Sequence, residues 1–147
     1  MATYSFMDVA AALDGPTGVV DLGYGAGVAD EGISVTMAGD KNTMLIGADG
    51  EGMHSLHADK SGTVTVRLLK TSDRNSILQA MFDAQTLSAS LHGKNVITIT
   101  NPKSGDITVC RSCAFKKKPD LTYKKDGDLV EWQLDAIKID TILGVYE

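Results

Sequence analysis

Residues 30–70 read DEGISVTMAGDKNTMLIGADGEGMHSLHADKSGTVTVRLLK, and they are the most informative part of the chain for the fold class. Apolar and polar residues alternate over residues 32–37 and again over residues 62–69. Period-two alternation is typical of strands in a sheet with one buried face. About two dozen residues rich in Gly, Asp and His separate the two strands, which is too many for an ordinary hairpin turn. We therefore expect this segment to be an arm or a surface that contacts another protein.

The rest of the chain predicts further short strands and one helix. Strands are expected at residues 5–13, 19–22, 96–100, 106–116 and 129–140, with turns at 14–18, 101–105 and 126–128. A helix is expected from a cap at Ser72 or Asp73 to about Ala89, because apolar residues follow helical spacing there. The predicted fold is mainly β, an antiparallel β-barrel or sandwich of about seven or eight strands with one flanking α-helix and a long inter-strand arm.

Composition limits the classes of function. The 147 residues fit one domain spanning 1–147, and aromatic residues make up only 5%, so the core must be aliphatic. The net charge of −5 argues against sequence-independent nucleic-acid binding, although it is compatible with a channel that DNA passes through. The sequence shows no membrane segment and no secretory signal, so we expect synthesis in the cytoplasm.

Several predicted strands have one apolar side and one side of small hydroxyl residues. The hydroxyl positions are Ser34, Thr36, Thr63, Thr65, Thr98 and Thr100. In the last strand, Val130, Trp132 and Leu134 alternate with Glu131, Gln133 and Asp135. Two interpretations of the polar sides are open: a solvated outer surface, or the wall of an aqueous lumen. Arg67 shares the polar parity, so in a lumen it must pair with a carboxylate or lie beyond the wall.

The candidates for chemistry are weak. Cys110 and Cys113 form C-x-x-C, but strand alternation points residues three apart to opposite faces, so we expect structural cysteines rather than a zinc site. His54 and His57 lie near acidic residues but lack a nucleophile, which favours an exposed arm over a general base. Residues 47–52 lack the Lys-Ser/Thr of a phosphate loop. We predict no catalytic, cofactor or metal residues, no cofactor and no enzyme activity.

The arm and one basic run are the candidate contact segments. The polar and charged arm residues proposed to reach an adjacent ring or subunit are Asp40, Lys41, Asn42, Asp49, Glu51, His54, His57 and Asp59. The basic run at residues 116–118, with Lys124 and Lys125 nearby, could bind nucleic acid, be solvated, or pair with an acidic patch on a neighbour.

Long strings of this sequence resemble the tail tube proteins of contractile-tailed phages. They are DKNTM, IGADGE, MHSLHA and KSGTVTVRLLKTS within residues 40–72, with TYSFMDV at the start, FKKKPDLTYKKDG at 115–127 and EWQLDAIKID at 131–140. The resemblance implies hexameric rings whose sheets join into one β-barrel, stacked into a tube inside a contractile sheath. The implied partners are copies of itself, the tail sheath, baseplate or initiator and terminator proteins, and passing DNA that is not specifically bound. The implied place is the tail of the virion.

Other functions remain as alternatives. Within virion proteins, the chain could be a tail terminator or an adaptor ring. Outside that class, it could be a monomeric metal- or ligand-binding β-barrel, or a hydrolase using His54 or His57.

Overall fold

The computed structural model describes residues 2–146, and at residues 29–31 the backbone alone. Within these residues the chain forms nine strands and one α-helix, preceded by a 3₁₀ turn at Phe6–Asp8. In chain order the elements are β1 (Ala10–Gly15), β2 (Gly18–Asp21), β3 (Val28–Met37), β4 (Asn42–Ile46), β5 (Gly52–Leu56), β6 (Gly62–Leu69), α1 (Arg74–Gln85), β7 (Asn95–Asn101), β8 (Asp106–Lys117) and β9 (Leu129–Ile142).

Seven of the strands form one antiparallel sheet in the order β2-β1-β7-β8-β9-β6-β3, and β4 pairs only with β5 in a separate hairpin. This confirms the predicted mainly β, antiparallel fold with a flanking helix and an arm. The sheet does not close into a barrel, so β2 and β3 are its edges.

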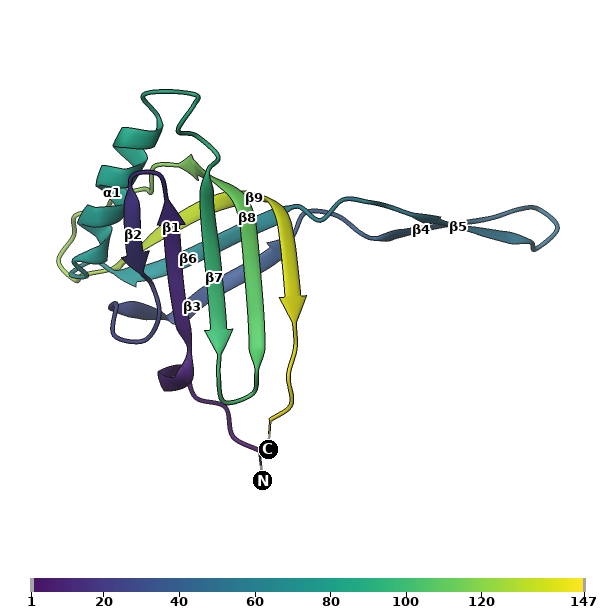
Figure 1. The fold of residues 1–147 in the computed structure, drawn as a ribbon, viewed down its shortest axis with the longest axis horizontal. Helices are drawn as coiled ribbons and strands as arrows, with labels where there is room; N and C mark the ends of the chain where they lie inside the picture. Colours follow the sequence, from purple (N-terminus) through teal and green to yellow (C-terminus); the bar gives the residue numbers. More distant parts are fainter. Residues whose placement is uncertain (1, 147) are drawn as a thin grey trace.

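The sheet bends where β8 and β9 cross from one half to the other. In β8, Cys110 and Cys113 are both buried, and in β9 so are Ala136 and Ile139. Two residues rather than one therefore separate successive core positions, and Ser112 has a φ of 54°. Figure 1 shows β1 and β7 running steeply across the direction of β3 and β6. Bends of this kind form the corner where strands pass from one part of a sheet to another.

We call the two parts of the sheet the β7 half and the β6 half. The β7 half comprises β2, β1, β7, residues 106–110 of β8 and residues 139–142 of β9. The β6 half comprises residues 113–117 of β8, residues 129–136 of β9, β6 and β3. The core lies between the two halves, with α1 on its flank.

Trp132 sits in this core and is 1% exposed, as expected from its place on the apolar side of β9. Its Nε1 donates to Asn75 Oδ1 on α1 at 3.1 Å. The indole packs edge-on against Phe115 with ring centroids 5.9 Å apart, and Phe115 packs in the same way against Phe82 at 5.8 Å. The helix is therefore joined to the core through a chain of three aromatic rings, with Phe115 in the middle.

The helix is shorter than predicted, because it ends at Gln85 rather than near Ala89. Gln85 is buried and exchanges two hydrogen bonds with the Asn95 amide, at 2.8 and 2.6 Å. Burying amide groups is costly unless they are hydrogen-bonded, so this reciprocal pair stabilises the junction of α1 with β7. The strand expected from residue 5 also begins later, because the Ser5 hydroxyl accepts from Met7 N–H and caps the 3₁₀ turn.

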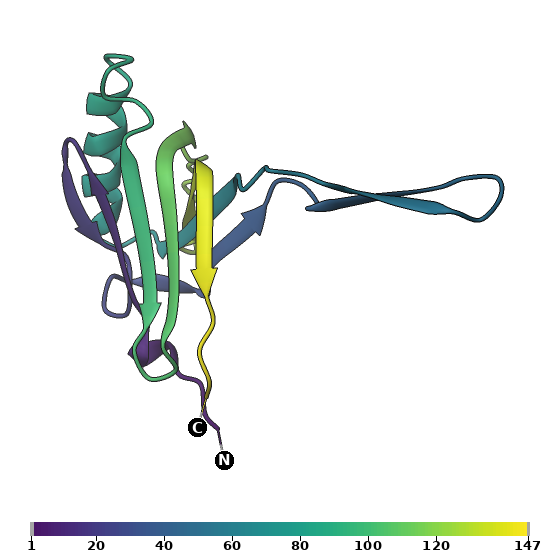
Figure 2. The ribbon, with the colours of Figure 1, turned by 45° about the vertical axis from the view of Figure 1, so that its right-hand side comes forward.

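The arm projects beyond the ends of β3 and β6, in roughly the direction of those strands (Figures 1 and 2). The N- and C-terminal segments lie side by side, and the Tyr4 and Tyr146 rings pack with their centroids 6.2 Å apart. Across residues 2–146, no helix has the length and apolar character needed to cross a membrane.

Candidate functional site

The β6 half carries a continuous polar face on the side away from the core. Its register pairs include Ser34↔Thr65, Thr36↔Thr63, Thr65↔Gln133 and Thr63↔Asp135. The Thr63 hydroxyl donates to Asp135 Oδ1 at 3.1 Å. Thr65 is only 9% exposed, so its neighbours provide most of the accessible surface. All the predicted lumen residues on β3, β6 and β9 therefore lie on one surface.

Arg67 lies on the same face and is held by two neighbours. Its Nη1 donates to Ser34 Oγ at 2.9 Å, and its Nε lies 3.9 Å from Glu131 Oε2. The sequence left two possibilities for Arg67, and the structure shows the one with a carboxylate partner. The guanidinium charge is therefore offset locally on this face.

Thr98 and Thr100 lie on a different part of the sheet. Their strand, β7, is separated from β6 by β8 and β9. Thr98 is paired with Ala12 of β1 and Val109 of β8, within the β7 half. The hydroxyls of these two threonines therefore do not join the polar face of the β6 half.

The structure adds Lys117 to the polar face. A register shift between Phe115 and Lys117 places Lys117 opposite Gln133, and these two residues line one hollow together with Glu131. Strict alternation from Phe115 would assign Lys117 to the core side. The bulge reverses that assignment and places Lys117 on the polar face. In the sequence, the only sign of this bulge was a lysine at a position where alternation predicts an apolar residue.

The arm is a regular hairpin. β4 and β5 pair antiparallel from Asn42↔Leu56 to Ile46↔Gly52. At the tip, Gly50 N–H donates to Gly47 O at 3.0 Å, and Gly50 has a φ of 90°, which glycine adopts without steric cost. Gly47 and Gly50 therefore make the turn of this hairpin.

The predicted arm residues lie at its base, along its strands and at its tip. At the base, Lys41 Nζ donates to the carbonyl oxygens of His57 and Asp59, at 2.8 and 3.3 Å. Hydrogen bonds from the hydroxyl and the N–H of Ser61 hold the pKa of Asp59 below its ordinary value. At the tip, Asp49 Oδ1 accepts from Glu51 N–H at 3.1 Å. The other predicted residues, Asp40, Asn42 and His54, are exposed along the arm.

The arm also exposes apolar side chains on both of its faces. Leu45 is paired with Met53 on one face, while Met44 is paired with His54 on the other. The exposed fractions range from 52% to 85% for the set Met44, Leu45, Ile46, Met53 and Leu56. An isolated two-stranded hairpin is marginally stable in water, and gathered exposed apolar residues mark contact surfaces. These residues were not among the predicted arm contacts, although the consecutive apolar residues 44–46 within a polar segment were visible in the sequence.

Cys110 and Cys113 are buried free thiols on the same face of β8. The sequence argument that placed them on opposite faces is wrong, because the left-handed Ser112 between them breaks the alternation. Burial raises the pKa of Cys110 to about 11 and that of Cys113 to about 12. Among the described residues, no group of three or more His, Cys, Asp or Glu is arranged to hold a metal ion.

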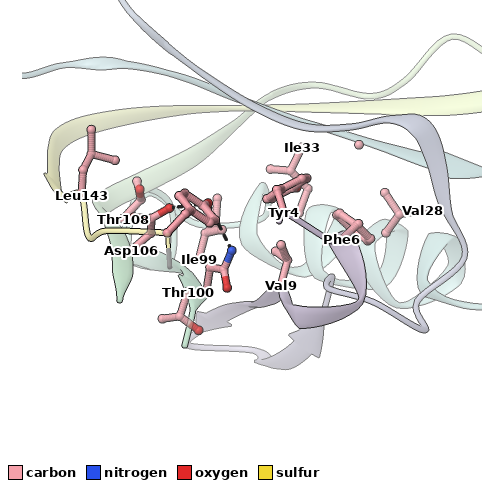
Figure 3. A pocket seen from close by; sticks show the side chains of 13 residues that line it. Tyr4, Phe6, Val9, Val28, Ile33, Ile99, Thr100, Asp106, Thr108 and Leu143 are labelled. Atoms are coloured by element: carbon pink, nitrogen blue, oxygen red, sulfur yellow. Dashed lines mark hydrogen bonds between the residues drawn. The ribbon is translucent and has the colours of Figure 1, made fainter. Parts of the chain in front are cut away.

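A cleft of about 510 Å³ lies where the terminal segments meet β3, β7 and β8. Figure 3 shows its apolar part, in which Tyr4 and Phe6 face Ile33 and Val28. Its carboxylate, Asp106, accepts from Tyr146 OH at 2.9 Å and from Gly144 N–H at 2.7 Å. These bonds, that from Gly144 foremost, hold the pKa of Asp106 below its ordinary value. Asp106 thus anchors the C-terminal segment beside the cleft.

One family model and several solved structures match this chain. The family model described as Bacteriophage PhiTE tail tube protein matches residues 1–144. None of the curated proteins matches the chain. A similar fold occurs in the PVC sheath-tube complex of an extracellular contractile injection system in its extended state, with a TM-score of 0.61, 11% identity, and coverage of 96% of this chain and 92% of that chain.

Two further solved structures share the fold. The PVC sheath/tube terminator in the extended state has a TM-score of 0.57 and 12% identity over 97% of this chain and 98% of that chain. The anti-feeding prophage cap, which terminates a tube, has a TM-score of 0.56 and 11% identity over 98% and 95%. At these identities the likeness shows the fold alone.

Proposed function

Because the chain belongs to the Bacteriophage PhiTE tail tube protein family, we propose that it forms stacked rings, hexameric by family resemblance, through which phage DNA is delivered into the host. The observation that carries this proposal is the geometry of the β6 half. Its polar face is continuous over three strands, and the arm extends from the same strands along their direction. If these strands run along the tube, the arm reaches the next ring.

The arm is the proposed contact between rings. Its apolar side chains lack cover in the subunit, and packing them against a second copy removes them from water. The polar and charged residues from Asp40 to Asp59 would hold the arm in position and complement the facing surface. A heterologous contact of this kind, repeated along an axis, produces an open stack.

The polar face of the β6 half is the proposed lumen wall. It consists of Ser34, Thr36, Thr63, Thr65, Glu131, Gln133 and Asp135, together with Arg67 and Lys117. Short hydroxyl side chains keep a bore wide and hydrated, and the carboxylates repel phosphate. The ion pair of Arg67 with Glu131 limits the attraction that the guanidinium offers to DNA.

In this proposal the protein is a non-enzymatic structural component of the virion tail, made in the cytoplasm of the host cell. Its partners would be other copies of itself, the tail sheath, the baseplate or initiator proteins and the terminator. DNA would pass without specific binding.

A tail terminator or adaptor ring is the second candidate, because a tube cap and a sheath/tube terminator share the fold. The two candidates differ in assembly. A tube protein polymerises to indefinite length, whereas a terminator stops at a single ring.

Negative-stain microscopy of the purified protein over a range of concentrations tests the proposal. We expect tubes or stacked rings. Single rings that never stack would favour the terminator, and a monomer at high concentration would contradict both. Deleting residues 47–52, the tip of the arm, should leave a folded subunit that no longer polymerises.

A further inference from the structure

We propose that Asp140 on β9 is the positioning residue of the arm: its carboxylate binds Lys60, at the base of the arm, together with Arg111 of β8, and so sets the direction in which the arm leaves the subunit. We call these three residues the arm clamp. The inference rests on the proposed function for what the arm contacts, whereas the clamp itself is a property of the single subunit.

The stem of the arm, residues 38–41 and 57–61, interrupts the strand ladder. The pairing of β3 with β6 ends at Gly62, and the pairing of β4 with β5 begins at Asn42. Four residues on one side therefore lie opposite five on the other, which breaks the regular register. An isolated two-stranded hairpin has little stability of its own. The arm therefore needs support from another part of the subunit to keep one direction.

Hydrogen bonds connect the two sides of the stem. Ala38 N–H donates to Ser61 O at 3.0 Å, and His57 N–H donates to Lys41 O at 2.9 Å. Lys41 Nζ in turn donates to the carbonyl oxygens of His57 and Asp59. Because the two sides are connected in this way, a support on one side holds both.

Lys60 attaches the stem to β9, beside the bend of that strand (Figure 1). Its carbonyl oxygen accepts from Ile139 N–H at 2.9 Å, and its backbone forms an isolated parallel bridge with Lys138. Its Nζ lies 3.2 Å from Asp140 Oδ1. One backbone bond fixes a point but leaves rotation about it, so the ion pair supplies the second attachment that sets a direction.

Arg111 holds the other oxygen of the same carboxylate. Its Nη1 lies 2.6 Å from Asp140 Oδ2, so both oxygens of Asp140 are bound by cations from two different segments. These contacts, that with Lys60 foremost, hold the pKa of Asp140 below its ordinary value and keep the group ionised. Asp140 belongs to the β7 half, whereas the arm emerges from the β6 half. The clamp therefore fixes the arm relative to the half from which it does not emerge.

The three side chains of the clamp are 43–51% exposed. Exposed ion pairs contribute little to the stability of a fold, and salt weakens them. A small free energy is sufficient here, because the competing states differ in the direction of the arm and not in the burial of core residues. Loss of the clamp should therefore loosen the arm without unfolding the subunit.

Spin-label distance measurements on subunits kept below the concentration of assembly test the clamp. The labels are carried by Ala48→Cys at the tip of the arm and Lys103→Cys in the exposed turn between β7 and β8, since the native cysteines are buried. We expect Asp140→Asn to broaden the distance distribution about twofold, because the exposed pairs are lost while the backbone bond at Lys60 remains.

Three controls separate the clamp from a general effect of the substitution. Asp140→Glu keeps the carboxylate and should keep the distribution narrow. Asp73→Asn removes an exposed ion pair with Arg74, near the opposite end of β6, and should not change the distribution. Salt at about 1 M should broaden the native distribution to that of Asp140→Asn and leave the variant unchanged. Thermal melting checks that each variant is folded.

Tube growth, followed by light scattering and negative-stain microscopy, measures the consequence for assembly. Asp140→Asn should slow growth about fivefold, because a smaller fraction of subunits holds the arm in the direction that binds. Asp140→Glu and Asp73→Asn should grow at the native rate.

The outcomes are distinguishable. An unchanged distribution for Asp140→Asn, or equal broadening by Asp73→Asn, would overturn the clamp and leave the proposed function standing. Broadening with tube growth at the native rate would overturn the role of the clamp in assembly. If the unmodified protein forms neither rings nor tubes, the proposed function fails, and the distance distributions still decide whether Asp140 sets the direction of the arm.

Discussion

Arg67 and Glu131 are register partners on β6 and β9, and Arg67 Nε lies 3.9 Å from Glu131 Oε2. Arg67 also donates to Ser34 on β3, so one side chain connects three adjacent strands of the polar face. The two side chains are 23% and 42% exposed, so solvent screens the pair and its contribution to stability is small. The pair instead limits the positive charge that the polar face presents, because the Arg67 guanidinium lies next to the Glu131 carboxylate.

The first prediction concerns the lumen. Thr36→Lys places a cation on the polar face of the β6 half, whereas Thr98→Lys makes the same change on the β7 half. Both variants should assemble. In phage particles we expect Thr36→Lys to slow DNA release roughly fivefold, because one ion pair in watery surroundings contributes about 1 kcal/mol. Release is measured by fluorescence of a DNA-binding dye after triggering. Equal slowing by both variants would mean that the polar face of the β6 half does not line the channel.

The second prediction concerns the apolar contacts of the arm. Leu45→Ser combined with Met53→Ser removes one cross-strand apolar pair that is exposed in the subunit. Because neither residue supports the core, the melting temperature should change little, while tube formation should be lost. Sedimentation and negative-stain microscopy measure assembly. Ser55→Ala, on the same strand, is the control and should polymerise normally. Tubes of normal length from the double variant would rule out an apolar contact at this pair.

The third prediction concerns the buried amide pair. Gln85→Ala removes both bonds to Asn95 and leaves a buried amide short of partners, which should lower the free energy of unfolding by about 1–3 kcal/mol. The variant with leucine at both positions should lose less than the sum of the two single changes, since it leaves neither amide unpaired. Urea unfolding measures both. Gln79→Ala on the same helix, where the side chain bonds only the exposed Asp83, should cost less than about 0.5 kcal/mol. Additive losses at positions 85 and 95 would show that the two amides act independently.

The fourth prediction concerns pH and the buried thiols. The pKa values of Cys110 and Cys113 are raised by burial to about 11 and about 12, so the folded state keeps protons that the unfolded state releases. This stabilisation is fully present below the ordinary thiol pKa of about 8.5 and is lost as the pH rises toward the folded values. Urea unfolding at pH 7.5 and pH 10 should therefore show a larger loss for the native protein than for a variant with alanine at both positions. Equal losses would contradict the prediction. The thiols should also resist labelling until the protein unfolds.

Local sequence pattern was sufficient to locate the seven strands of the main sheet and the existence of the arm, but it did not indicate the two strands β4 and β5 within the arm. β6 has the predicted bounds, and the alternation of Val130, Trp132 and Leu134 identified their burial correctly. Alternation is a property of neighbouring residues in one strand, and it reports burial on one side without reference to other strands. The arm was predicted from the length and the Gly and Asp content of the segment between two alternating strands.

Which residues share a surface depends on the arrangement of the strands in space. Thr63 and Thr98 have the same local pattern, yet they lie on different halves of the sheet, because strand order and the bend between the halves separate them. The left-handed Ser112 places both cysteines in the core, and the bulge before Lys117 moves a lysine onto the polar face. Strand order, register shifts and bends depend on pairing between residues far apart in the chain. Local alternation therefore indicates which residues are buried or polar in an undistorted strand, whereas long-range pairing sets where a strand is distorted and which polar residues share a surface.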